Sequence, residues 1–235
     1  MTALEPVAYA HGGKSLTGWL AHPEGPARAA IVVYPTIANV TPATERRAAM
    51  LAQHGYLAMI ADFYGEPVAS FEASAPLAKA LRADAEFYRA RVVAAVAALR
   101  AHPLASGLPL ATIGHCMGGQ AALEAARGGE ALLATVSFHG DLATQLPARA
   151  GDISARILVC HGDADPLVPR EAVLRFWDEM DAAGANWHFH SYSGVKHGFT
   201  DPGSDARGLP AIAYNASADR QSWQSMLGLF DEVLG

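Results

Sequence analysis

Short apolar runs alternate along the chain with longer segments that have helical spacing. Residues 7–9 and 16–21 are extended runs on either side of His11-Gly12-Gly13-Lys14, which predicts an antiparallel hairpin at the edge of a sheet. Further strands are predicted over residues 30–34, 56–62, 110–113, 135–138, 156–161 and 187–192. Residues 30–34 form an unbroken apolar run, which is typical of a strand that is covered on both faces.

Helical patterns occupy the segments between these strands. Thr41-Pro42 predicts an N-cap followed by proline in the first turn, and the helix that they start should stop at Gly55. A long helical pattern covers residues 71–101, and we expect any break in it near Ala75-Pro76. The remaining helices are predicted over residues 120–127, 171–183 and 223–234.

The alternation of strands and helices predicts an α/β fold, with a mostly parallel sheet wrapped by helices on both faces. We expect the 235 residues to form a single domain, residues 1–235. In sheets of this kind the reactive site lies at the carboxyl ends of the strands. Polar residues that directly follow strands are therefore the candidates for function.

Composition and charge exclude several classes of partner. The net charge is -6 and no Lys/Arg run occurs, so nucleic acid is not an expected partner. No stretch has the length and apolar character of a membrane span, and no signal peptide is recognisable at the N-terminus, so we expect a cytoplasmic protein with no membrane partner. The two cysteines are too few for a disulfide framework, and Cys160 is expected to be a small core residue.

One strand-to-turn segment carries the first chemical signal. The predicted strand 110–113 leads into Gly114-His115-Cys116-Met117-Gly118-Gly119, and helix-forming residues follow. This is the G-x-nucleophile-x-G pattern of a nucleophile elbow, with cysteine as the candidate nucleophile. Glycine is needed on both sides because the central residue adopts a strained conformation where a flanking Cβ would collide. The positive end of the following helix would favour the thiolate of Cys116.

Two further loops supply an acid and a base. Asp163 and Asp165 follow one predicted strand, and His197 follows the next. The order nucleophile, acid, histidine is that of the α/β-hydrolase triad. Both aspartates compete for the acid role, and we prefer Asp165 because it fits the loop pattern G-x-x-D-x-x-V, whereas Asp163 is expected to cap the turn.

Each of these groups has a defined chemical role in the expected reaction. His197 would take the thiol proton and later protonate the leaving group, while Asp165 would orient the imidazole. The backbone N–H groups of Met117 and Ile37 are the expected oxyanion-hole donors. No cofactor is implied and no metal is expected, because no third ligand accompanies the histidine pair His188 and His190.

The chain resembles the dienelactone hydrolase family of α/β-hydrolases. The resemblance rests on the cysteine elbow, on Asp165-Pro166-Leu167-Val168-Pro169, on His197-Gly198-Phe199, and on Asp62-Phe63-Tyr64-Gly65. It implies hydrolysis of an activated ester or lactone, a small-molecule substrate, through a covalent thioester on Cys116. Two positions depart from the family pattern: Thr36 stands where a glutamate contacts the cysteine, and Asp201 stands where an arginine binds the substrate carboxylate.

Other residues near the predicted site are candidates for the substrate pocket. They are Thr36, Tyr64, His115 and His139. Two other classes of function stay open beside hydrolysis: a non-catalytic small-molecule-binding homologue of the same fold, and an acyltransferase that uses the same triad. Both a monomer and a homodimer are compatible with this sequence.

Overall fold

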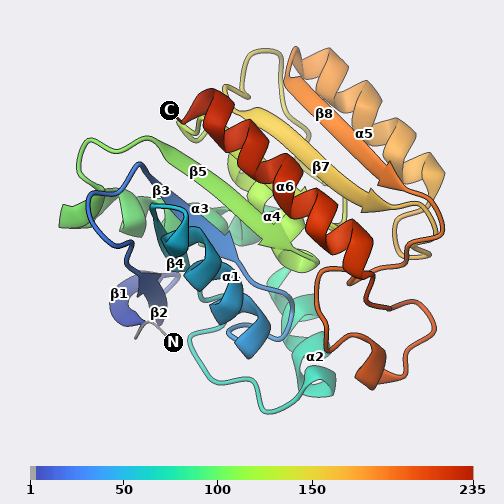
Figure 1. Ribbon diagram of the computed structural model, residues 1–235, viewed down its shortest axis with the longest axis horizontal. Helices are drawn as coiled ribbons and strands as arrows, with labels where there is room; N and C mark the ends of the chain where they lie inside the picture. Colours follow the sequence, from blue (N-terminus) through green and yellow to red (C-terminus); the bar gives the residue numbers. More distant parts are fainter. Residues whose placement is uncertain (1–3, 235) are drawn as a thin grey trace.

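The computed structural model describes residues 4–234 and contains one eight-stranded sheet flanked by helices (Figure 1). The strands are β1 (Glu5–His11), β2 (Lys14–Ala21), β3 (Ala29–Tyr34), β4 (Tyr56–Ile60), β5 (Leu110–His115), β6 (Ala134–Phe138), β7 (Arg156–Gly162) and β8 (Asn186–Tyr192). The helices are α1 (Pro42–Gln53), α2 (Phe71–Leu81), α3 (Ala85–Ala101), α4 (Met117–Arg127), α5 (Arg170–Ala183) and α6 (Ala216–Val233), with short 3-10 turns at Pro103–Ala105 and Asp205–Arg207.

The order of strands across the sheet is β1-β2-β4-β3-β5-β6-β7-β8. The β1–β2 hairpin is antiparallel and β2 also pairs antiparallel with β4, whereas every pairing from β4 through β8 is parallel. The predicted α/β-hydrolase architecture with an N-terminal antiparallel hairpin is therefore confirmed. Because β3, β5, β6, β7 and β8 are parallel, their carboxyl ends lie at one edge of the sheet.

Two apolar layers form because successive side chains of a buried strand point to opposite faces. On β3, Val32 packs in the layer that contains side chains of α3, α4 and α5, and Ile31 and Val33 pack in the layer formed with α1 and α6. Figure 1 shows α1 and α6 in front of the sheet and α3 and α4 behind it. The all-apolar strands predicted from the sequence are thus covered on both sides.

The predicted helix over residues 71–101 is broken, but not at Ala75-Pro76. Pro76 lies inside α2, and the break falls between Leu81 and Ala85. Asp84 caps the new helix, since its side chain accepts a hydrogen bond from the Phe87 N–H. The expectation was wrong about which residue sets the break. The Asp84 side chain caps a new helix at its N-terminus, whereas Pro76 removes only one backbone hydrogen bond and α2 continues past it.

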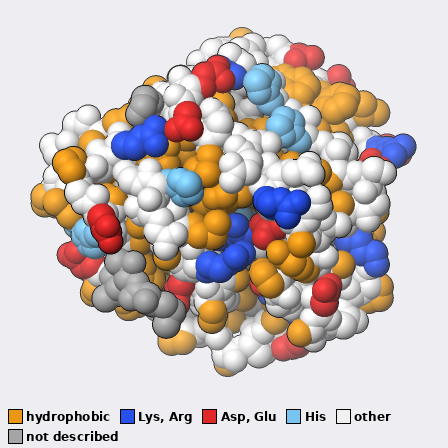
Figure 2. All heavy atoms as spheres, in the orientation of Figure 1, with side chains coloured by type: hydrophobic (Ala, Val, Ile, Leu, Met, Phe, Trp, Pro, Cys, Tyr) orange, Lys and Arg blue, Asp and Glu red, His pale blue; other side chains and the backbone are white. Residues whose placement is uncertain are grey.

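On the face of the molecule seen in Figure 2, charged side chains are interspersed rather than gathered by sign. The face shown in Figure 2 carries basic and acidic groups side by side with apolar ones. Among the helices that the structure describes, none has both the length and the apolar character needed to cross a bilayer. Cys160 is fully buried on β7, and both cysteines are unpaired.

In the turn from β5 into α4 the backbone is packed closely against neighbouring backbone atoms. Cys116 has φ 57° and ψ -121°, a left-handed conformation that is costly for a residue with a side chain. A Cβ on Gly114 would lie 1.8 Å from the carbonyl oxygen of Gly118, and a Cβ on Gly118 would lie 2.1 Å from the carbonyl oxygen of Tyr34. Both contacts are with backbone atoms, so neither position can accept a larger residue without a shift of the main chain.

We expect Gly118→Ala to lower the free energy of unfolding by about 3 kcal/mol, at the upper end of the cost of overpacking. The reason is the collision with Tyr34, which the end of β3 cannot relieve. Urea unfolding followed by circular dichroism measures the effect. Gly228→Ala is the matched control, because a Cβ added there would meet no other part of the structure within 4 Å, and the change to alanine in a helix should stabilise by up to about 1 kcal/mol. Equal effects of the two substitutions would contradict the prediction.

Candidate active site

Three chemically competent side chains from distant parts of the chain meet at the carboxyl edge of the sheet. Cys116 follows β5, Asp165 follows β7 and His197 follows β8. Asp165 and His197 are buried, and Cys116 is partly exposed. Cys116 and His197 line a cavity at this edge, and Asp165 lies behind His197, outside the cavity wall. The structure thus brings together the three residues that the sequence predicted as a triad.

A short hydrogen bond orients the imidazole. His197 Nδ1 lies 2.7 Å from Asp165 Oδ2, and the other carboxylate oxygen accepts the Leu167 N–H at 2.8 Å. Asp163 instead forms an ion pair with Arg170 at the surface, at 2.7 Å. Of the two aspartates that compete in the sequence, Asp165 is therefore the one that holds His197. Its position in the loop keeps its carboxylate away from solvent.

The environment of Cys116 favours the thiolate. Burial by itself raises the pKa of the Cys116 thiol, but the positive charge and hydrogen bonding of His197 and the backbone N–H groups of Met117 and Ile37 bring this pKa below its ordinary value. Burial also lowers the pKa of His197, and the opposing effects of the Cys116 thiolate and Asp165 raise it to about 10. His197 Nε2 is buried and has no hydrogen-bond partner of standard geometry among the described residues. The pKa shifts have the directions in which each group favours the charged form of the other, as in a thiolate–imidazolium ion pair.

The loop that follows β3 presents the Ile37 N–H to the sulfur. The Tyr64 hydroxyl donates to the Ile37 carbonyl oxygen at 3.0 Å. Asn39, with φ 61°, donates from its side chain to the buried Asp62 at 2.9 Å and accepts the Phe63 N–H. Tyr64 does not line the cavity, so its place is behind the loop that carries one of the two expected oxyanion donors rather than in the substrate pocket.

A second polar chain supports Cys116 from the other side. The backbone N–H of Cys116 donates to His139 Nδ1 at 3.1 Å, and His139 Nε2 lies 2.8 Å from the Thr200 hydroxyl oxygen, which is 3.0 Å from His115 Nδ1. Burial holds the pKa values of both histidines well below the ordinary value, so the rings are neutral. Because His139 Nδ1 accepts, His139 Nε2–H donates to Thr200, whose own proton goes to His115.

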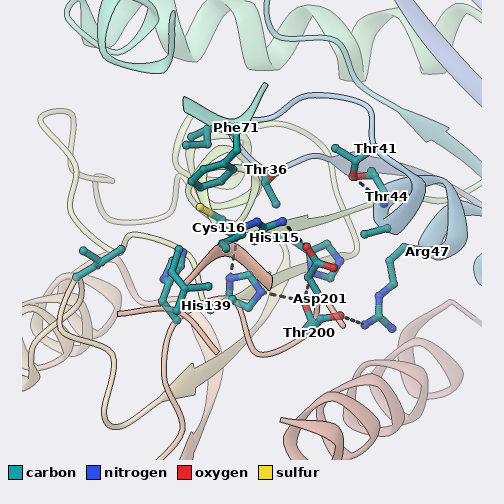
Figure 3. Close-up of a pocket in the computed structure, with 17 residues that line it drawn as sticks. Thr36, Thr41, Thr44, Arg47, Phe71, His115, Cys116, His139, Thr200 and Asp201 are labelled. Carbon is teal, nitrogen blue, oxygen red and sulfur yellow. Dashed lines mark hydrogen bonds and ion pairs between the residues drawn. The ribbon is translucent and has the colours of Figure 1, made fainter. Parts of the chain in front are cut away.

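A cavity of about 110 Å³ opens in front of Cys116 (Figure 3). Of the residues predicted for the pocket, Thr36, His115 and His139 line it. Leu167, from the acid loop, and Asp201, at the position that departs from the family pattern, also line the cavity. Sequence reasoning missed the rest of the wall, because these residues belong to no motif and reach the cavity only through the tertiary fold. They include Arg47 from α1, Phe71 from α2, and Thr200, Arg207 and Ile212 from the segment between His197 and α6.

The groups at this edge are a thiol, an imidazole, a carboxylate and backbone donors, a set that suits nucleophilic acyl transfer. Within residues 4–234, no set of three or more His, Cys, Asp or Glu side chains is arranged to hold a metal ion.

The fold and this arrangement define an α/β-hydrolase. The model of the dienelactone hydrolase family matches residues 16–234, and the chain belongs to that family. It is a hydrolase, as its relatives are.

Three relatives show how far the likeness extends. A dienelactone hydrolase-like promiscuous phosphotriesterase, P91, from metagenomic libraries is 34% identical, with 99% of each chain covered and a TM-score of 0.91. A protein named probable 2-oxo-3-(5-oxofuran-2-ylidene)propanoate lactonase, from a Bradyrhizobium species, is 27% identical over 96% of this chain and 92% of its own. A structure named putative dienelactone hydrolase, from Klebsiella pneumoniae, is 22% identical, and the match covers 97% of this chain and 98% of that protein. Its TM-score of 0.79 shows that the two share the fold.

We expect iodoacetamide to alkylate Cys116 with a pH midpoint below about 8.5, the ordinary thiol value. Alkylation follows the thiolate fraction, which rises with pH through the thiol pKa, so a lowered pKa moves the midpoint to lower pH. Burial raises the pKa of Cys160 to about 12, so Cys160 should stay unmodified in the folded protein. Mass spectrometry of the two cysteine peptides measures both. His197→Gln should move the Cys116 midpoint upward, and an unchanged midpoint would contradict the ion pair.

Proposed function

We propose that the protein hydrolyses activated esters or lactones through a Cys116-His197-Asp165 triad and a thioester intermediate. The observation that carries this proposal is the 2.7 Å bond from His197 to the buried Asp165, which leaves the other imidazole nitrogen for the Cys116 thiol. The family to which the chain belongs supports it, and so does the name of the lactonase relative. Each step of the reaction can be assigned to a group at the site.

In the first half of the reaction the Cys116 thiolate attacks the carbonyl carbon of the substrate. The negative charge moves to the carbonyl oxygen, where the N–H groups of Met117 and Ile37 stabilise it by a few kcal/mol, roughly 3. The carbon–oxygen bond then breaks, and His197 gives its Nε2 proton to the leaving oxygen. The product of this half is an alcohol, or the open hydroxyl end of a lactone, and a thioester on Cys116.

In the second half water replaces the leaving group. Neutral His197 takes one proton from the water, whose oxygen attacks the thioester carbon, and the same two N–H groups again hold the oxyanion. Collapse of the intermediate breaks the carbon–sulfur bond and regenerates the thiolate beside imidazolium. Asp165 keeps the imidazole in one tautomer throughout, since it binds the Nδ1 side.

The thiolate restricts which substrates react. A tetrahedral intermediate expels its better leaving group, and a thiol of pKa about 8.5 leaves more readily than a simple alkoxide. Acylation therefore goes forward mainly with enolates, phenolates or other stable anions as leaving groups. Activated esters and enol lactones meet this condition, and amides do not.

We expect Cys116→Ala to lower kcat/KM for 4-nitrophenyl acetate by at least about a thousandfold, because no other group can form the acyl-enzyme. Rapid acid quench followed by mass spectrometry should show the wild-type protein heavier by one acetyl group on the Cys116 peptide. Cys160→Ala is the matched control, since it removes the other thiol and should keep the activity. Activity that survives in Cys116→Ala would overturn the proposed mechanism.

We also expect the rate to depend steeply on the leaving group. 4-Nitrophenyl acetate should be hydrolysed with kcat/KM at least about a hundredfold above that for ethyl acetate, because ethoxide leaves worse than the Cys116 thiolate. Spectrophotometry for the aryl ester and a pH-stat for the alkyl ester give the two values. Similar values for the two esters would argue against a thiolate nucleophile.

A further inference from the structure

The charged side chains of the cavity are all paired with one another or with a neighbour. Apart from Cys116 and His197, three charged residues line it, Arg47, Asp201 and Arg207, and the rest of its wall is apolar, hydroxyl-bearing or formed by the neutral histidines. Whether a charged substrate can bind therefore depends on whether these charges are free. The contacts of each residue answer this question.

Arg47 is not free to bind an anion. Its guanidinium forms an ion pair with Asp219 and donates to the Thr200 carbonyl oxygen at 2.7 Å, and the side chain is 4% exposed. The guanidinium also lies over the Trp223 ring, 5.0 Å from its centroid. Figure 3 shows Arg47 on the side of the cavity away from Cys116, with Thr200 between them. The charge of Arg47 is thus neutralised within the wall.

Arg207 and Asp201 neutralise each other in another part of the cavity wall. Arg207 Nη2 donates to Asp201 Oδ2 at 2.5 Å, and the side chains are 24% and 18% exposed. The Arg207 guanidinium carbon lies 4.8 Å from the centroid of the Phe71 ring, which fixes the cation from a second direction. The other carboxylate oxygen of Asp201 accepts the Gly203 N–H at 2.9 Å. Both carboxylate oxygens of Asp201 are therefore engaged inside the loop, and the positive charge of Arg207 is already paired.

We propose that this site selects esters and lactones whose acyl part carries no charge, and that Asp201 is the residue that sets this selectivity. This inference rests on the proposed function. A carboxylate on the acyl part would lose its hydration in the cavity and find no unpaired cation in return, because Asp201 already neutralises Arg207. An uncharged acyl part has neither cost. Selectivity of this kind arises from repulsion of the wrong substrate as much as from attraction of the right one.

Two substrates that differ by one charge test the proposal. They are the mono-4-nitrophenyl ester of adipic acid and the methyl 4-nitrophenyl diester of the same acid. The leaving group and the acyl chain are the same, and the chain is too long for its carboxylate to attack its own ester efficiently. The ratio of kcat/KM for the neutral diester to that for the monoanion reports the selectivity directly.

For the wild-type protein we expect this ratio to be at least about 10, and Asp201→Asn should lower it at least about tenfold through faster turnover of the monoanion. Asparagine keeps the oxygen that accepts the Gly203 N–H, so the loop conformation is retained while the charge that neutralises Arg207 is removed. Arg207→Gln alone should act in the opposite sense and raise the ratio, because Asp201 is then unopposed. Asp201→Asn combined with Arg207→Gln should lose the gain on the monoanion.

The control is Glu232→Gln, which changes the net charge of the chain by the same amount as Asp201→Asn. Glu232 is paired with Arg156 at the C-terminal end of α6 and does not line the cavity, so its ratio should match that of the wild type. If wild type hydrolyses the neutral diester but Asp201→Asn and Arg207→Gln leave the ratio unchanged, the inference about charge is wrong. If wild type hydrolyses neither ester, the proposed function itself fails.

Discussion

The close approach of strand β5 and helix α4 is the constraint from which the geometry of the site follows. With Gly114 and Gly118 in backbone contact, Cys116 has to adopt a left-handed conformation between them. The same approach places Gly118 against the Tyr34 and Pro35 carbonyl groups at the end of β3. One steric arrangement therefore positions the thiol, the Met117 N–H and the start of the loop that carries the Ile37 N–H.

Burial opposes the ionised form of this thiol, and the groups around it outweigh burial. A thiolate in an apolar place is costly unless charges and donors compensate it. Here the His197 ring and two backbone N–H groups act on the sulfur, and their combined effect leaves its pKa below the ordinary value. His197 is in turn held by Asp165, which has no exposed side-chain surface. The site is thus a short chain of compensating charges, in which removal of one member leaves the next unpaired.

The parts of this site that could be predicted are those that follow strands. Cys116, Asp165 and His197 each lie in the turn or loop that follows a predicted strand, and parallel strands bring such positions to one edge. Phe71, Arg207 and Ile212 could not be found in this way, since no local pattern shows that α2 and the segment after His197 face the same cavity. The helical break was misplaced for a similar reason: Pro76 is the more conspicuous signal, while the effective one is the side chain of Asp84.

Chemistry and selectivity are consequently encoded in different parts of the chain. The triad residues are anchored at the ends of strands inside a sheet that is covered on both faces, so their relative positions are set by the core. Asp201 and Arg207 instead lie in one loop between β8 and α6, and their contacts are mainly with each other and with Phe71. A substitution of either side chain there is expected to change the charge that a substrate meets while the strand-anchored Cys116 and His197 keep their positions. Loops on a rigid scaffold allow a site to change its substrate while the reaction stays the same.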